Sequence, residues 1–180
     1  MPGPVAAEPP ARERALGALT GLALGDALGM PTQSMSPAQI RRCYGEITGL
    51  RDAVAEQPIA PSAPAGTVTD DTEQALILAG LLIDGGGRID PHRLAEALLT
   101  WEDDMRARGS LDLLGPSTKL ALERVRAGAD PHCTGRQGTT NGAAMRVAPV
   151  GIAFSLSADG DALARAVRAS CLVTHDTRQG

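Results

Sequence analysis

Aromatic residues are nearly absent from this sequence of 180 residues, at 2% of the total. Trp101, Tyr44 and Phe154 occur once each, so the core must be built from Leu, Ala, Val and Ile. Such side chains suit closely packed helices better than a β-sandwich, whose strands favour aromatic and β-branched residues. No run of about 18 apolar residues occurs either, which excludes a membrane span.

Cysteine and clustered basic charge are also scarce. The three cysteines, Cys43, Cys133 and Cys171, are odd in number and widely spaced, so they indicate neither a disulfide framework nor a CxxC zinc site. The start MPGPVAAEPPARER has no apolar core of a signal peptide, and we expect a reducing, cytoplasmic setting. A formal net charge of -4 without a Lys/Arg run gives no nucleic-acid footprint.

The pattern of apolar and polar residues predicts an all-α protein, because no alternating segment is long enough to indicate a sheet. Helix signals include Ser36-Pro37, Asp90-Pro91 and Gly115-Pro116 at the starts and glycines at the ends. Residues 1–10 hold four prolines and are expected to be a disordered tail. Helices are expected over residues 11–29, 36–44, 70–83, 91–108, 117–127, 143–156 with a break at Pro149, and 161–173.

Two of these helices have unusual patterns. The first has Gly17, Gly21, Gly25 and Gly29 at intervals of four, a smooth stripe that predicts close packing against another helix. The helix that starts at Asp70 is apolar almost all round, which predicts a central, buried position. By contrast, residues 55–66 and 130–138 are non-periodic and are interpreted as loops, the first as the most mobile part of the body.

The segment Thr69-Asp70-Asp71-Thr72 lies where the central helix begins. It has two interpretations. Asp70 with Glu73 resembles a capping box, and acids favour the positive end of a helix. Alternatively, two carboxylates and a hydroxyl form an all-oxygen site for Mg²⁺ or Mn²⁺. The apolar helix favours the metal, since it would bury carboxylates that need compensation.

Three further segments carry polar residues that are weak signals in isolation. Gly25-Asp26-Ala27-Leu28-Gly29 reads as a glycine-rich helix end. Thr139-Thr140-Asn141-Gly142 could seat a phosphate at a helix start, or could be a simple Asn-Gly turn. Thr174-His175-Asp176-Thr177 could be a ligand or a solvated helix end.

Together and in this order, the four motifs resemble the ADP-ribosylglycohydrolase family, from about Arg14 to Thr177 and including Leu114-Gly115-Pro116-Ser117-Thr118. The resemblance implies a compact, orthogonal all-helical domain with two Mg²⁺ (or Mn²⁺) ions in a cleft. It assigns metal ligation to Thr69, Asp70 and Asp71, and catalysis also to Asp70 and Asp71, with Asp26 as support. It places Asn141, Gly142 and Ala143 at the diphosphate of an ADP-ribosyl substrate, and His175 near the adenosine-side ribose or phosphate.

Two departures from the family pattern affect the expected activity. Gln33 is the third expected catalytic residue, at a position where many relatives have Glu. An amide cannot exchange protons usefully near neutral pH, but it can orient a water or a ribose by hydrogen bonds. The family's later Asp-x-Asp-Thr motif is also absent, so we expect residues 11–180 to be the N-terminal part of one domain, truncated on its C-terminal side and inactive alone. Exposed apolar surface is expected to promote self-association.

The leading hypothesis is therefore hydrolysis of an N- or O-glycosidic bond to ADP-ribose or a related ribosyl compound. The alternative is an inactive relative that binds ADP-ribose or a nucleotide, or that has a structural, crystallin-like role.

Overall fold

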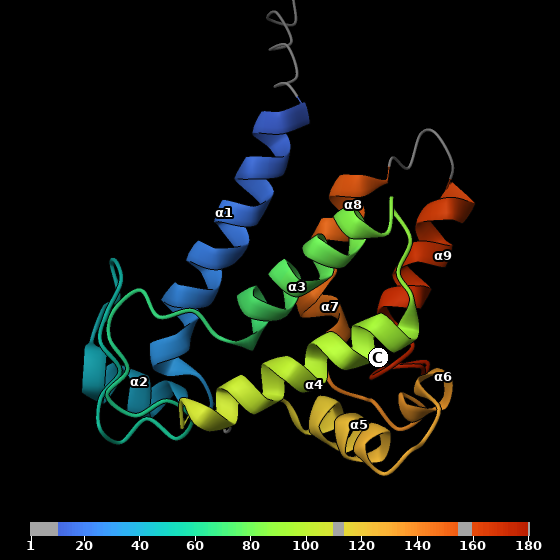
Figure 1. The fold of residues 1–180 in the computed structure, drawn as a ribbon. Coiled ribbons are helices and arrows are strands. Elements are labelled where there is room, and N and C mark those ends of the chain that lie inside the picture. The colour runs from blue at the N-terminus through green and yellow to red at the C-terminus, as the bar shows by residue number, and fades with distance from the viewer. Residues whose placement is uncertain (1–10, 110–113, 155–159, 180) are drawn as a thin grey trace, which may run out of the picture.

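Helices dominate the computed structural model, which describes residues 11–109, 114–154 and 160–179 (Figure 1). No strand occurs in these ranges, so the all-α prediction is confirmed. The expected tail, residues 1–10, lies outside them. The helical elements are α1 (Ala11–Gly29), the 3-10 helix η1 (Met30–Thr32), α2 (Pro37–Tyr44), α3 (Asp70–Asp84), α4 (Pro91–Ala107), α5 (Pro116–Arg126), α6 (Pro131–Thr134), α7 (Gly142–Arg146), α8 (Ala148–Ala153) and α9 (Gly160–Cys171).

The predicted helix starts at Ser36 and Asp90 are confirmed by their caps. The Ser36 side chain accepts a hydrogen bond from Gln39 N, and the Gln39 side chain accepts one from Ser36 N, which is a complete capping box. The Asp90 carboxylate accepts from the backbone N–H groups of His92 and Arg93. Each cap is followed by proline in the first turn, where no N–H is needed.

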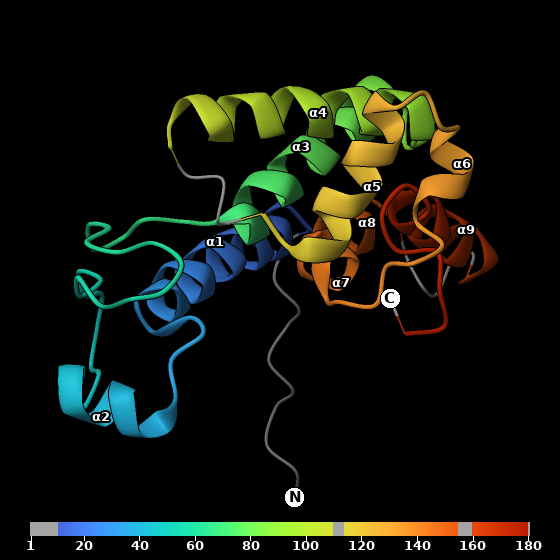
Figure 2. The ribbon, with the colours of Figure 1, turned by 90° about the horizontal axis from the view of Figure 1, so that it is seen from below.

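Helix α3 lies at the centre, as predicted, between α1 on one side and α7 and α8 on the other, with α4 crossing it (Figures 1 and 2). Its inner face joins a core of aliphatic side chains from α3, α4, α5 and α8 and the segments after α3 and α9. The buried members are Leu78, Leu82, Ile89, Leu94, Ala95, Leu98, Leu122, Val150 and Val173.

Burial of α3 on every side was predicted and is wrong. Leu76 is 56% exposed and Ile83 80% exposed, and Gly80 between them is exposed as well. These positions are spaced by four and three residues, so they form one face. The neighbouring helices surround the rest of α3, and within the described part of the chain nothing covers this face.

The predicted packing of the glycine stripe is also wrong. A Cβ built on Gly17, Gly21, Gly25 or Gly29 meets no atom of the described structure within 4 Å. Helix α1 instead packs on α3 and α8 through the side that carries Leu19, Leu22, Ala23 and Ala27. Leucine and alanine on that side offer apolar surface to bury, which a glycine stripe does not. Gly17 and Gly21 are therefore exposed, whereas Gly25 and Gly29 line the pocket described below.

The remaining differences between the predicted and observed helices involve short helices. The expected loop at 130–138 contains α6, whose first turn is capped by Asp130. The helix expected from Ala143 breaks at Val147 rather than Pro149, because Pro149 lies in the first turn of α8. Residues 55–66 contain no helix or strand, as predicted. None of the helices in the described ranges has the length and apolar character needed to cross a membrane.

Candidate active site

Asp26, near the end of α1, holds the start of α3 in place. Its carboxylate accepts hydrogen bonds from the backbone N–H and the hydroxyl of Thr69, at 2.8 and 2.7 Å. It also accepts from the N–H and the hydroxyl of Thr72, at 3.2 and 2.5 Å. Asp26 thus supplies, from another helix, the acceptor that a free helix N-terminus requires.

Thr69, not Asp70, is the N-cap of α3. The capping box suggested for Asp70 and Glu73 is therefore wrong. The Glu73 carboxylate instead accepts from Trp101 Nε1 at 2.6 Å and from both terminal nitrogens of Arg108 at 3.0 and 2.9 Å. The Thr69 side chain accepts from Asp71 N, and Asp26 accepts from Thr72 N, so the carboxyls of Asp70 and Asp71 are not needed to cap the helix.

The two adjacent carboxyls sit in an environment that disfavours their own charge. Burial, followed by the charge of Asp71 and then of Asp26, raises the pKa of Asp70 to about 7. Burial and the charge of Asp26 also raise the pKa of Asp71, although the Thr69 hydroxyl, 3.3 Å from Asp71 Oδ2, opposes this. A hard divalent cation would remove this electrostatic cost, so the donor set fits the metal implied by the resemblance.

Gln33 follows η1 and is fixed through its backbone. The side chain of the buried Gln57 donates to the carbonyls of Met30 and Gln33, at 3.1 and 3.2 Å. Gln57 belongs to the segment that was expected to be the most mobile, yet it is 2% exposed. The Gln33 side-chain oxygen is buried and has no hydrogen-bond partner, so it is available to accept from a ligand or a water.

These elements meet around a pocket of about 330 Å³. Four of the predicted site residues line this pocket, namely Gln33, Thr69, Asp71 and Asn141. Asp26, predicted to support the site, lines it as well. Asp70 is not among its lining residues and is 4% exposed, with Oδ2 on the side of Gly115. The structure thus brings together residues separated by more than 100 positions.

Gly142, Ala143 and His175 lie behind the pocket wall. All three are buried, and a Cβ added to Gly142 would lie 2.8 Å from His175 Cε1. Only glycine fits between this ring and the start of α7. His175 also lines a second pocket of about 560 Å³ beside α9, and the ribose or phosphate contact predicted for it stays a prediction. Gly142 and Ala143 can meet a ligand only through their backbone.

His175 belongs to a buried polar chain that the sequence did not reveal. Arg146 is fully buried and donates to Gln74 Oε1 at 2.9 Å and to Thr174 Oγ1 at 2.6 Å. His175 contacts the same Thr174 hydroxyl through Nδ1 at 2.8 Å, and the Thr140 hydroxyl through Nε2 at 2.9 Å. In the sequence, the signal for this buried polar chain was Arg146, because a charged residue between apolar segments is buried only when it is paired.

Electrostatics keeps this imidazole neutral. Burial and the charge of Arg146 lower the pKa of His175 to about 4. The arrangement that uses every hydrogen in these contacts has Thr174 donating to Nδ1, which places the ring proton on Nε2. His175 then donates to Thr140, immediately before the pocket residue Asn141, so it supports the predicted phosphate segment from behind.

Comparison with known proteins agrees with these motifs. The ADP-ribosylglycohydrolase family model matches residues 7–180. The chain belongs to the ADP-ribosylglycohydrolase family. It is 39% identical over 139 residues to the Escherichia coli (strain K12) protein YegU, covering 77% of this chain and 41% of that protein. It is 34% identical over 154 residues to the ADP-ribosyl-[dinitrogen reductase] glycohydrolase of Rhodospirillum rubrum, covering 81% and 46%.

A solved structure of the family extends this likeness to three dimensions. The chain superimposes on an ADP-ribosylglycohydrolase-related protein complex with a TM-score of 0.69 and 31% identity. The match covers 94% of this chain and 51% of that one. The chain therefore spans about half the length of this solved family member, and less than half of each curated relative just described.

Proposed function

We propose that this chain carries the cation-holding part of a hydrolase site for ADP-ribosyl compounds. The reaction would cleave an N- or O-glycosidic bond to ADP-ribose or a related ribosyl compound, with two Mg²⁺ (or Mn²⁺) ions in the whole site. The observation that carries the proposal is the pocket where Thr69, Asp71, Gln33 and Asn141 meet, with Asp26 behind Thr69. The names of relatives such as the Rhodospirillum rubrum glycohydrolase support the substrate class.

Each residue has a defined task in this proposal. Thr69 and Asp71 present oxygens to the pocket, and Asp70 completes the set from the buried side. Asp26 accepts four hydrogen bonds from Thr69 and Thr72, so in this proposal it orients the ligands. When bound, the cations would orient the ribose hydroxyls and activate a water for attack at the anomeric carbon.

The phosphate end of the substrate would lie at the start of α7. Asn141 faces the pocket, and the N–H groups of Gly142 and Ala143 follow it. Unpaired N–H groups at a helix start favour an anion. His175 would contribute by holding Thr140 in position.

Gln33 favours a second candidate, a relative that binds ADP-ribose without hydrolysing it. The amide oxygen can accept a hydrogen bond in the pocket, but it cannot act as a general acid or base. In the catalytic alternative, Gln33 orients a water or a ribose hydroxyl and another group moves the proton.

The two candidates are separated by measuring hydrolysis and binding together, on this chain and on the longest product of its reading frame. Asp70→Asn with Asp71→Asn should abolish Mg²⁺-dependent turnover and leave helix content unchanged. The matched control is Asp103→Asn with Asp104→Asn, an adjacent acidic pair exposed on α4, which should keep turnover. Turnover that survives the first double substitution would reject the metal role.

Gln33→Glu tests the second candidate. A carboxylate at this position should raise hydrolysis by about 10²–10⁴-fold if proton transfer is what the wild-type protein lacks. Calorimetric binding of ADP-ribose without turnover in the wild type, with turnover in Gln33→Glu, would establish a binding protein. Unchanged turnover in Gln33→Glu would show that position 33 is not where the proton moves.

A further inference from the structure

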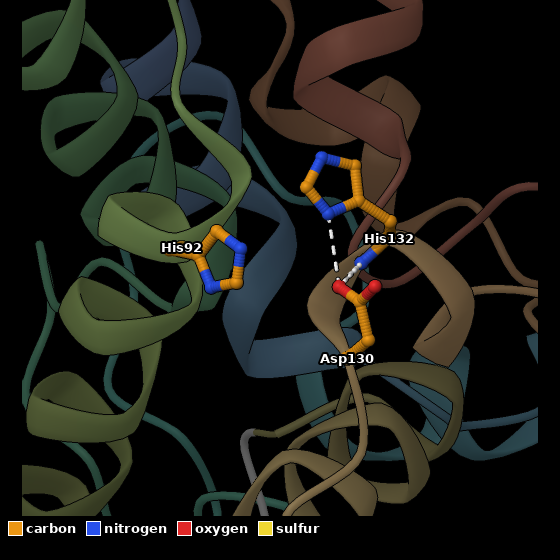
Figure 3. Close-up of side chains that lie close together, drawn as sticks. All are labelled: His92, Asp130 and His132. Carbon is orange, nitrogen blue, oxygen red and sulfur yellow. Dashed lines mark hydrogen bonds and ion pairs between the residues drawn. The ribbon is translucent and has the colours of Figure 1, made fainter.

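Three metal-ligating side chains gather on the surface where α4 and α6 begin. They are His92 on α4, Asp130 just before α6, and His132 on α6 (Figure 3). One donor atom of each lies within 4.8 Å of the others. None of the three lines the pocket that contains Asp71 and Gln33, so the cluster is separate from the candidate active site.

Backbone structure fixes the positions of these side chains. Asp130 is the N-cap of α6, and its Oδ1 accepts from the backbone N–H of His132 and contacts His132 Nδ1, both at 2.9 Å. The backbone N–H of His92 is held by Asp90, the N-cap of α4. Two unrelated caps thus bring two imidazoles together, with ring centroids 5.3 Å apart and an interplanar angle of 62°.

Carboxylates lie at both helix starts that carry these imidazoles. Asp130 Oδ1 lies against the His132 ring, and Asp90 Oδ1 accepts from the backbone N–H groups of His92 and Arg93. The cluster thus offers a cation one carboxylate oxygen from Asp130 and one ring nitrogen from each histidine.

We propose that His92, Asp130 and His132 form a surface site for a borderline transition-metal ion, with Zn²⁺ as the reference occupant. Two imidazole nitrogens and one carboxylate oxygen are zinc ligands at about 2.0–2.2 Å, and water fills the remaining position. Such bonds place donor atoms about 3.3–3.6 Å apart in a tetrahedron, so the side chains must close inward. His132 and Asp130 are about half exposed, at 49% and 60%, and have room to turn.

Ligand chemistry separates this site from the oxygen-lined pocket. Imidazole favours zinc and its neighbours in the transition series, whereas carboxylate and hydroxyl oxygens favour Mg²⁺ or Mn²⁺. The surface site does not depend on the proposed hydrolase function, and its test does not require turnover.

Occupancy would tie α6 to α4 and steady the segment behind His175. The Thr134 hydroxyl on α6 donates to the Val173 carbonyl at 2.7 Å, and Asp176 N donates to the Gly135 carbonyl at 2.9 Å. A metal that fixes α6 therefore also fixes the backbone on both sides of His175. Stabilisation on metal binding is the expected readout, since the unfolded chain does not keep the three donors together.

The experiment titrates Zn²⁺ into the metal-free full chain by calorimetry and follows its melting temperature. We expect one site, with a melting temperature raised by about 5 °C or more at a hundredfold excess over Kd. His92→Ala and His132→Ala should each weaken Zn²⁺ binding by at least tenfold. His92→Gln, which keeps side-chain volume, should weaken it equally, and circular dichroism checks that each metal-free variant is folded.

Two controls exclude other sources of zinc binding. Cys133→Ser removes the thiol next to His132 and should leave the affinity unchanged. Glu96→Gln removes a nearby exposed acid that is not in the cluster and should also have no effect. Millimolar Mg²⁺ should not displace the zinc. The proposal is overturned if His92 variants bind Zn²⁺ like the wild type, or if Cys133→Ser abolishes binding.

Discussion

Asp70 is a single carboxyl whose burial works against the stability of the metal-free protein. Its folded-state pKa of about 7 lies above its ordinary value of 3.8. The folded state therefore holds this proton more tightly, and the resulting stability is present below about pH 4 and is lost as the pH rises toward 7. The loss is of order 4 kcal/mol at most, because one pKa unit corresponds to 1.36 kcal/mol.

We therefore predict that Asp70→Asn is more stable than the wild type at pH 8 in EDTA. The advantage should shrink toward pH 4.5, where the wild-type carboxyl is protonated in the folded state. Urea unfolding at the two pH values measures both effects, with the exposed Asp84→Asn as a control that should show neither. A variant that is less stable at pH 8 would mean that Asp70 is stabilised by contacts an amide cannot replace.

His175 has the opposite dependence on pH. Its pKa of about 4 lies below the ordinary value of 6.5, so the unfolded state binds the extra proton first. Stability is complete above pH 6.5 and falls as the pH is lowered to 4, by about 3 kcal/mol. His175→Gln should lose this acid sensitivity, and it should be less stable than the wild type at pH 7.5, where the neutral imidazole keeps its hydrogen bonds.

The measurement is the unfolding free energy of wild type minus that of His175→Gln, from pH 7.5 to 4. Both proteins contain Asp70, so taking the difference removes its contribution to the pH dependence, which has the opposite sign to that of His175. The difference should be constant above about pH 6.5 and decline from there to pH 4. A flat difference would show that the His175 imidazole is not held neutral in the folded protein.

At this scale the sequence predicted some of the side chains that line the pocket, but not the contacts that support them. Thr69, Asp71, Gln33 and Asn141 are polar residues in motifs, and they do line one pocket. The supporting contacts of Asp26 with Thr69 and of Arg146 with Gln74 join positions 43 and 72 residues apart. No local pattern encodes such pairs, so they required the folded chain.

Among the elements, helix α1 shows that a residue pattern can predict which side chains share a face without predicting what packs against that face. The interval of four correctly places its glycines on one face, but it does not say whether that face is covered. Because no atom of the described structure lies within 4 Å of a Cβ at Gly21, an added methyl group meets open space. We predict that Gly21→Ala raises the unfolding free energy by about 0.5–1 kcal/mol, since alanine favours helix.

Gly142→Ala is the matched opposite case. Its Cβ would lie 2.8 Å from the buried ring of His175 and 3.3 Å from the Thr118 hydroxyl. It should destabilise the protein and displace the start of α7. Chemical denaturation of both variants checks the pair. Loss of stability in Gly21→Ala would show that the stripe is covered in solution after all.

Helix starts were predictable where a cap and a proline coincide, as at Ser36 and Asp90. The last third of the chain was harder, because α6, α7 and α8 have four to six residues. Such helices are too short to show a hydrophobic period, and a proline can equally end one helix or begin the next. Here Pro149 begins α8 rather than ending a longer helix, so the break falls at Val147.

The whole molecule exposes several large apolar side chains, mainly on α1 and α3. Self-association remains a prediction, and the exposed face of α3 offers a direct test. Leu76→Lys with Ile83→Lys should reduce any oligomer seen by analytical ultracentrifugation without lowering helix content, because neither side chain is in the core. The control is Leu120→Lys, at an exposed side chain on α5, which should leave the oligomer unchanged. An unchanged oligomer would place the interface elsewhere.

The packing of α1 also has a consequence for the growing chain on the ribosome. Helix α1 is made early, but one of its two main partners, α8, begins about 120 residues later. At 5–20 residues per second, that interval lasts roughly 6–24 s. During this time the Leu19 and Leu22 side of α1 has no α8 to cover it, whereas Thr69 and Thr72 reach Asp26 after only 43 and 46 residues. The contact of Asp26 with the start of α3 can therefore form long before α8 completes the packing of α1, a helix weakened by four glycines.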